Sequence, residues 1–215
     1  MDTAALITAF VALLVVIDPI GLTPMFVALT QGMTTHARRS IALRACIVAI
    51  GLLTLFGLLG DKVLGFIGIS MPAFQISGGI LLFLTALDML FERRSKRRQG
   101  QASEDEPADD PSVFPLAMPL IAGPGAMTAM ILLASAPGNG WADMLAVHLV
   151  MAGVILVVFT LFLAAGLLER ALGPTGINVV TRLLGMLLAA LSVQFVLDGM
   201  RAVGLFNGQI TGLTG

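Results

Sequence analysis

The chain has 215 residues, of which 57% are hydrophobic and only 12% are charged, and its net charge is −1. Because a soluble domain carries about 25% charged residues, this composition excludes an ordinary soluble domain and indicates a protein embedded in a membrane. The single cysteine, Cys46, excludes an internal disulfide bond and a metal centre built from several cysteines.

Six apolar stretches are each close to the roughly 20 residues that a helix needs to cross a bilayer. They cover residues 6–29, 41–59, 71–91, 114–134, 144–167 and 183–203. No Lys or Arg precedes Arg38, so the first stretch lacks the positive start of a cleaved signal peptide and is expected to be a retained span. Between spans we expect an interfacial segment at residues 63–69 and a loop at residues 169–182.

The first span is interrupted at residues 18–25, which read DPIGLTPM. Proline lacks an N–H and crowds the preceding turn, so Pro19 and Pro24 break the helical hydrogen-bond ladder. Gly21 permits a close approach of the backbone, and Asp18 places a carboxylate where charge costs about 2.5–3.5 kcal/mol on insertion scales. Irregular backbone at this depth is tolerated only when it is buried in protein or lines a watery cavity. The segment therefore predicts a broken helix at a functional site.

A second interruption lies in the fourth span, at residues 123–130, which read GPGAMTAM. It aligns with the first without gaps, so that Pro19 matches Pro124 and Thr23 matches Thr128. Because each half holds three spans, an odd number, the second half must enter the membrane in the opposite sense. We therefore expect an all-α polytopic membrane protein of six transmembrane helices, arranged as two inverted three-helix repeats with helices one and four broken.

The third spans of the two halves support the same register. The segment GILL at residues 79–82 aligns with GMLL at residues 185–188, which places Asp88 opposite Gln194. Small residues let helix backbones approach closely in membranes. Gly78 and the first glycine of each aligned segment are therefore expected to mark close helix crossings.

Between the two halves the sequence becomes basic and then acidic. The run RRSKRR at residues 93–98 precedes an acidic, proline-containing stretch at residues 101–111 that is nearly free of large apolar side chains and is expected to be disordered. The expected division is residues 1–93 for the first repeat, 94–112 for a cytoplasmic charged linker and 113–215 for the second repeat, all within one integral membrane domain.

The basic residues predict the orientation. Of the twelve Lys and Arg residues, all but Lys62 and Arg201 lie in or beside the loops that follow spans one, three and five. Cytoplasmic loops carry an excess of Lys and Arg, so both termini are expected on the non-cytoplasmic side of the membrane. The basic run is interpreted as a topology signal, not as a nucleic-acid-binding segment.

The two breaks carry the candidate chemistry. A broken helix leaves free N–H groups at one side of the break and free carbonyls at the other, and these ends attract anions and cations respectively. Two breaks that meet could hold the carboxylate and ammonium groups of a zwitterion, although an ion or another small polar solute would suit the same ends. The candidate substrate-binding residues are Asp18, Pro19, Gly21, Thr23, Gly123, Pro124, Gly125 and Thr128.

Single residues leave alternatives open. Asp18 binds a substrate ammonium group, relays a proton, or caps the half-helix that follows the break. The glycines beside the second break leave room for a substrate or let two helices pack closely. Asp88 and Gln194 are secondary site candidates, for which an interfacial ion pair and an interhelical hydrogen bond are the respective structural alternatives. His148, near the start of span five, senses pH or is an interface histidine.

Five segments together resemble the MarC family of bacterial inner-membrane proteins. They are DPIGLTP at residues 18–24, SGGILLF at 77–83, PLIAGPGA at 119–126, RLLG at 182–185 and ALSVQFVLDG at 190–199. The resemblance covers nearly the whole chain apart from the acidic linker at residues 101–111. It implies a six-span membrane protein that is related to transporters of small neutral amino acids such as glycine and alanine.

We therefore interpret the chain as a secondary transporter, importing or exporting small neutral amino acids and coupled to a proton or another ion. Motifs for nucleotide binding, metal hydrolysis and nucleophilic catalysis are missing from the sequence, so neither an enzyme nor a cofactor is expected beyond the coupling proton or cation. The expected partners are a neutral amino acid and membrane lipid, without nucleic acid and with homo-oligomers left open. The alternative is a non-transporting scaffold or regulator that acts through the cytoplasmic loop at residues 92–112.

Overall fold

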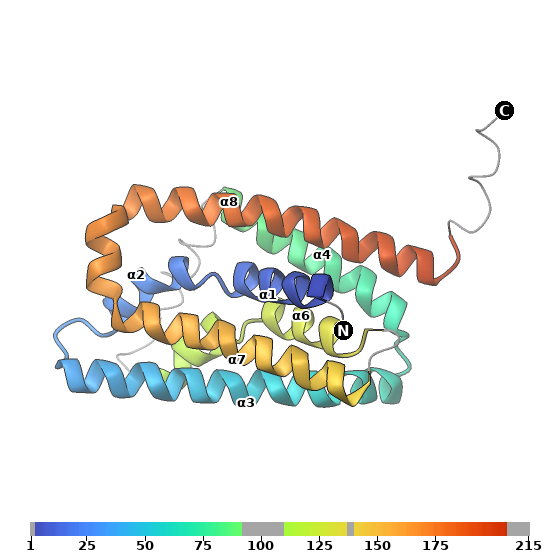
Figure 1. The fold of residues 1–215 in the computed structure, drawn as a ribbon, viewed down its shortest axis with the longest axis horizontal. Coiled ribbons are helices and arrows are strands. Elements are labelled where there is room, and N and C mark those ends of the chain that lie inside the picture. Colours follow the sequence, from blue (N-terminus) through green and yellow to red (C-terminus); the bar gives the residue numbers. More distant parts are fainter. Residues whose placement is uncertain (1–2, 92–109, 137–139, 206–215) are drawn as a thin grey trace.

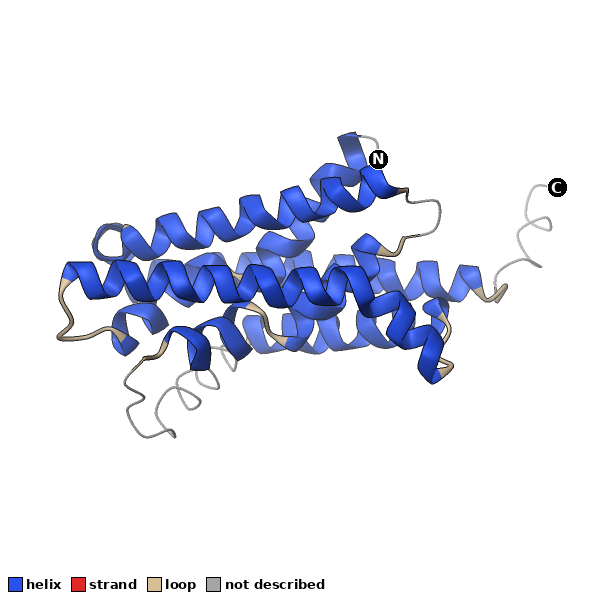
Figure 2. Cartoon of the chain, turned by 90° about the horizontal axis from the view of Figure 1, so that it is seen from below, coloured by secondary structure: helices blue, strands red, loops and turns tan. Residues whose placement is uncertain are grey.

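The computed structural model describes residues 3–91, 110–136 and 140–205, and the regular structure of these residues is helical throughout (Figure 2). The elements are α1 (Thr3–Ile17), α2 (Pro19–Leu29), α3 (Thr35–Ile67), α4 (Met71–Leu90), η1 (Ser112–Ile121), α6 (Pro124–Ala134), α7 (Trp141–Leu163) and α8 (Ala165–Ala202).

Six membrane spans follow from these helices. Among the described residues, five helical stretches are long and apolar enough to cross a membrane, and α1 with α2 forms one of them. The sixth is the pair of η1 and α6, whose axes are bent by 58° at the break between them. Successive spans run in opposite directions, and the start of α1 and the end of α8 lie toward the same end of the bundle (Figure 1). The prediction of an all-α protein with six spans, of which the first and fourth are broken, is confirmed.

The second span is longer than predicted. Helix α3 continues through Gly60, Asp61 and Lys62, so the expected helix end at these residues and the separate segment at residues 63–69 are wrong. Asp61 and Lys62 are exposed and therefore stay solvated on a helical turn. The helix ends at Gly68, whose φ of 86° is the left-handed conformation that closes many helices.

The loop expected at residues 169–182 is also wrong. Helix α8 begins at Ala165 and runs to Ala202, with a single kink at Gly173, where φ is 61° and ψ is 176°. Pro174 follows the kink, and proline is well suited to the first position of a helix because its missing N–H would be unpaired there. The short first part of α8 crosses the end of the bundle, and the long second part returns beside α4 (Figure 1).

Helices α4 and α8, the third spans of the two halves, pack as an antiparallel pair (Figure 1). A methyl group on Gly79 would lie 2.8 Å from the carbonyl oxygen of Ser192, and one on Gly185 would lie 3.2 Å from that of Ala86. In the repeat register Gly185 is the counterpart of Gly79, and Ser192 is the counterpart of Ala86. The contact of Gly79 with Ser192 is therefore the repeat equivalent of the contact of Gly185 with Ala86. A pseudo-twofold relation between inverted repeats predicts such equivalent contacts.

The first broken span lies inside the bundle. In Figure 1, α1 and α2 lie between the α4–α8 pair and helices α3 and α7. Leu13, Ile17 and Leu22 are fully buried, and the ring of Phe26 stacks on that of Phe162 with 4.4 Å between centroids. Large apolar side chains cover the outside, including Phe66 with 93% of its surface exposed. An apolar outer surface is what a helical bundle presents to lipid.

Candidate functional site

The first break is built on Asp18. Its φ of 55° and ψ of 66° are left-handed, which Asp tolerates because its short side chain hydrogen-bonds locally. The N–H of Gly21 donates to Asp18 Oδ1 at 3.0 Å, so the carboxylate caps helix α2. Pro19 occupies the first helical position, where no N–H is needed. The predicted break is confirmed, and the capping interaction considered for Asp18 is present.

Gly21 makes this cap sterically possible. A methyl group on Gly21 would clash with Asp18 Oδ2. The carboxylate thus occupies the space that a side chain at position 21 would fill. Gly21 is part of the Asp18 cap, and any larger residue would displace the carboxylate.

Asp18 also connects the first span to the last. The residue is buried, with 1% of its surface exposed. The hydroxyl of Thr181, on α8, donates to Asp18 Oδ2 at 3.5 Å, and Thr181 is itself buried. The sequence did not single out Thr181 because it fell within the supposed loop at residues 169–182, and a lone threonine carries no motif. The structure therefore adds Thr181 to the residues around the first break.

The second break has no such carboxylate. Gly123 precedes α6 in an extended conformation and supplies no side-chain cap. A methyl group on Gly123 would lie 2.6 Å from the carbonyl oxygen of Pro119, so the tight turn out of η1 requires glycine. The first N–H groups of α6 consequently lack the side-chain acceptor that Asp18 supplies to α2.

The two breaks lie next to each other. A methyl group on Gly125 would lie 3.3 Å from Cγ1 of Val16, at the end of α1, and 3.5 Å from Cδ2 of Leu82 on α4. Helices α2 and α6 both begin at the breaks and run away from them in opposite directions (Figure 1). Their N-terminal ends, which carry partial positive charge, therefore both face the middle of the bundle.

The matched threonines have local roles in this conformation. Thr23 is fully buried, and its hydroxyl donates to the carbonyl oxygen of Pro19 at 3.0 Å, within its own half-helix. The methyl group of Thr128 faces α4, since a methyl group on Gly78 would lie 2.6 Å from Thr128 Cγ2. The close helix crossing expected at Gly78 is confirmed.

The secondary candidates lie elsewhere. Asp88 is half-buried near the C-terminal end of α4. Gln194 is exposed on α8, where its Nε2 donates to Asp198 Oδ1 at 2.9 Å, and Asp198 in turn pairs with Arg201 at 3.0 Å. The structure thus places Gln194 in an exposed polar row along α8 and does not bring it to the breaks.

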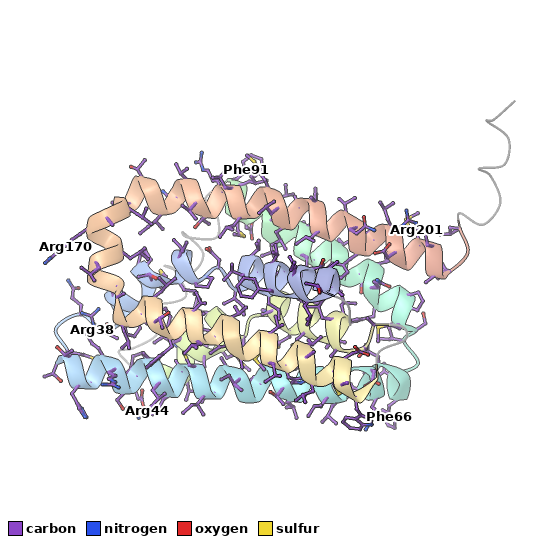
Figure 3. The ribbon with its side chains drawn as sticks, viewed as in Figure 1. Arg38, Arg44, Phe66, Phe91, Arg170 and Arg201 are labelled. Carbon is purple, nitrogen blue, oxygen red and sulfur yellow. The ribbon has the colours of Figure 1, made fainter. Side chains whose placement is uncertain are left out.

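Positive charge gathers at one end of the bundle. Arg38 and Arg170 lie at the same end, and Arg201 lies at the other (Figure 3). Only the last residues of the expected charged linker are described, because residues 94–109 lie outside the described part of the chain. There Asp110 pairs with Arg44 of α3 at 2.5 Å. Hydrogen bonding from Ser112, together with the Arg44 guanidinium, lowers the pKa of Asp110 below its ordinary value.

Six apolar spans that alternate in direction, two of them broken beside each other inside the bundle, define a polytopic α-helical integral membrane protein. The sequence matches the family described as MarC family integral membrane protein over residues 3–203. The chain belongs to this family, as its sequence segments indicated.

Relatives match over nearly their whole length. A UPF0056 membrane protein of Aquifex aeolicus is 39% identical over 202 residues, covering 91% of this chain and 92% of the relative. A UPF0056 membrane protein of Methanocaldococcus jannaschii is 36% identical over 205 residues, covering 94% and 98%. The UPF0056 inner membrane protein YhgN of Escherichia coli is 33% identical over 196 residues, covering 91% and 96%. No solved structure matches the chain.

Proposed function

We propose that the protein is a secondary transporter of small neutral amino acids such as glycine or alanine. The observation that carries this proposal is the chemical difference between two adjacent breaks. The first holds a buried carboxylate, Asp18, whereas the second presents the N-terminus of α6 without a side-chain cap. A zwitterion brings an ammonium group that complements the carboxylate and a carboxylate that complements the helix N-terminus.

The packing beside the second break supports a small substrate. A methyl group on Gly125 would already contact Val16 and Leu82, at 3.3 and 3.5 Å. A substrate that binds at the second break after opening would lie between helices that pack closely around Gly125, which suits a hydrogen or methyl side chain better than a branched or aromatic one. This favours glycine and alanine within the class of neutral amino acids.

Transport would require the breaks to open. Asp18 and Thr23 are at most 1% exposed, so a substrate reaches them only after the surrounding helices separate. Alternating access in inverted-repeat transporters occurs largely by rocking of one repeat against the other, and the α4–α8 pair is the symmetric contact about which these halves could rock. The same site serves import or export, with a proton or cation as the coupling ion.

We assign the protein to a bacterial inner membrane, as the name of its Escherichia coli relative suggests for that protein. The end of the bundle that carries Arg38 and Arg170 (Figure 3) is assigned to the cytoplasm, because cytoplasmic segments are enriched in Lys and Arg. Both ends of the chain then face outward.

The test is uptake of labelled glycine and alanine into proteoliposomes, measured as gradient-driven accumulation and as counterflow. Asp18→Asn keeps the left-handed backbone and the cap, because Asn caps about as well as Asp, and it removes only the charge. If Asp18 binds the substrate ammonium group, both activities fall by about tenfold or more, since a hydrogen bond to a charged group contributes about 1.5–3 kcal/mol. Asp198→Asn, on the exposed face of α8, is the matched control and retains both.

Other outcomes discriminate the remaining roles. If Asp18→Asn loses accumulation but retains counterflow, Asp18 is a proton relay. If Asp18→Asn has wild-type rates in both assays, Asp18 only caps helix α2. Wild-type protein that transports neither amino acid refutes the proposed function. Shortening the linker at residues 94–109 then tests the alternative, because a scaffold or regulator acting through that loop loses its phenotype, whereas a transporter keeps its flux.

A further inference from the structure

His148 on α7 presents its two ring nitrogens to different environments. Its Nδ1 atom lies 2.7 Å from the carbonyl oxygen of Met144. Because a carbonyl oxygen only accepts hydrogen bonds, Nδ1 carries a proton and donates it there. Nε2 then becomes the acceptor of a neutral ring, and it is buried without a hydrogen-bond partner among the described residues.

This nitrogen points into a niche at Gly57 of α3. A methyl group on Gly57 would lie 3.0 Å from His148 Nε2 and 2.9 Å from Cε of Met130 on α6. The missing side chain of Gly57 therefore makes room for the imidazole edge and the methionine methyl group, and three spans meet at this point. Met130 belongs to the half-helix that begins at the second break, about 9 Å away along the helix axis.

The helices around the niche contribute few charges. On α3 the nearest charged residues along the chain are Asp61 and Lys62, one turn beyond Gly57, and both are exposed. On α7 itself, Asp143 accepts the N–H of Gly140 at the start of the helix. Helices α1, α2 and α6, within their described bounds, carry no titratable side chain.

We infer that His148 is a proton-binding site that couples protonation to the packing of α6 against α3 and α7. The inference rests on the proposed transport function, for which His148 supplies the site of the coupling proton. The ring lies seven residues from Trp141, where α7 begins, which is about 10 Å along the helix. The proton would enter from the aqueous phase at this end of α7.

The surroundings of Nε2 determine whether protonation favours or opposes this helix packing. Protonation places a second N–H on Nε2, facing the Cα side of Gly57 and the methyl group of Met130, which accept no hydrogen bond. A buried charge without compensation is strongly disfavoured, so the imidazolium leaves the niche or the helices separate and admit water. Acid therefore favours a conformation in which α6 is released from α3 and α7, and the neutral ring favours the packing described above.

The first measurement is independent of transport. The chain has two histidines, His36 and His148, so histidine-labelled His36→Gln protein gives ¹⁵N signals from His148 alone. The ¹⁵N signals of His148 are recorded as the pH is lowered from about 8 to about 5, and they are expected to change from those of the Nδ1–H tautomer to those of an imidazolium. A His148 signal that stays unchanged over this range overturns the inference.

The second measurement follows the helices. Spin labels are placed on Ser135, the partly exposed residue that ends α6, and on the exposed position Leu149 of α7, in a Cys46→Ala background that removes the native thiol. The distance distribution between the labels is expected to change over the same pH range in protein with His148 and to stay constant in the His148→Gln variant. The same pH response in both proteins contradicts the coupling.

The third measurement separates this inference from the proposed function. His148→Gln is expected to lose about tenfold or more of proton-driven glycine accumulation while keeping counterflow, and His36→Gln, at an exposed position, keeps both. Wild-type accumulation by His148→Gln overturns the inference and leaves the transport proposal intact. If the wild-type protein transports neither glycine nor alanine, the transport proposal fails, and with it the role of His148 in coupling.

Discussion

Replacing Gly79 by alanine tests the helix contact on which the pairing of the two repeats depends. The added methyl group would lie 2.8 Å from the carbonyl oxygen of Ser192 and 3.1 Å from the backbone nitrogen of Val196. Both atoms belong to the backbone of α8, so no side-chain rotation relieves the contact. Helices α4 and α8 must move apart instead.

The size of the effect follows from these distances. Restoring an ordinary contact of 3.4 Å from 2.8 Å requires a separation of about 0.6 Å, and a gap of 0.5–1 Å loses about a quarter to a half of the dispersion energy of the atoms involved. Overpacking of this kind costs about 1–3 kcal/mol. Alanine is favoured over glycine in a helix by about 0.8–1.0 kcal/mol, so the net loss of stability is up to about 2 kcal/mol.

Gly51 provides the matched control, because it lies within α3 and a methyl group there would meet nothing within 4 Å. Gly51→Ala is stabilised by the higher helix propensity of alanine and makes no close contact. The difference in free energy of unfolding between Gly79→Ala and Gly51→Ala therefore measures the packing cost alone, about 1–3 kcal/mol. The measurement is denaturant unfolding in mixed micelles followed by circular dichroism. Equal stability of Gly79→Ala and Gly51→Ala would refute the close crossing of α4 and α8.

Two further predictions concern the site and the topology. Gly125→Ala adds a methyl group at 3.3 Å from Val16 and is expected to reduce transport of alanine about tenfold more than that of glycine, since one methyl group in a tight site changes rates by about 10–200-fold. Competing uptake of the two amino acids measures this ratio, and an equal loss for both would indicate helix packing instead. Cysteines placed at residues 101–111 in a Cys46→Ala background are expected to react with an impermeant thiol reagent only from the cytoplasmic side, because of the basic residues at that end of the bundle. Leu205→Cys, on an exposed side chain at the far end, is the control and reacts only from outside, and labelling of the linker from outside contradicts the orientation.

The breaks could be predicted from the sequence because their signals are local. A proline that cannot continue a helical ladder, such as Pro19 or Pro124, marks its position whatever surrounds it. The alignment of the two halves then predicts that the matching segments occupy equivalent positions in the fold. The exchange of contacts at Gly79 and Gly185 follows the register of that alignment.

Contacts between distant segments could not be predicted in this way. Glycine, proline and charged residues at 169–182 have the composition of a loop, yet one left-handed residue, Gly173, turns the chain and the helix resumes. Thr181 therefore reaches Asp18 from a helix that the sequence pattern hides. Gly57 is likewise unremarkable in sequence, and the pattern that singles out His148 does not reveal its neighbour, because their relation exists only where α3 and α7 pack together.

The departure from symmetry at the breaks strengthens the case for a zwitterionic substrate. An inverted repeat places equivalent backbone at both breaks, and two capping carboxylates there would repel each other and exclude an anionic group. Two uncapped helix ends would instead attract anions alone. With Asp18 at one break and Gly123 at the other, the protein keeps one negative group and one free helix N-terminus side by side. Such a pair complements a molecule that carries both charges, as the proposed amino-acid substrate does.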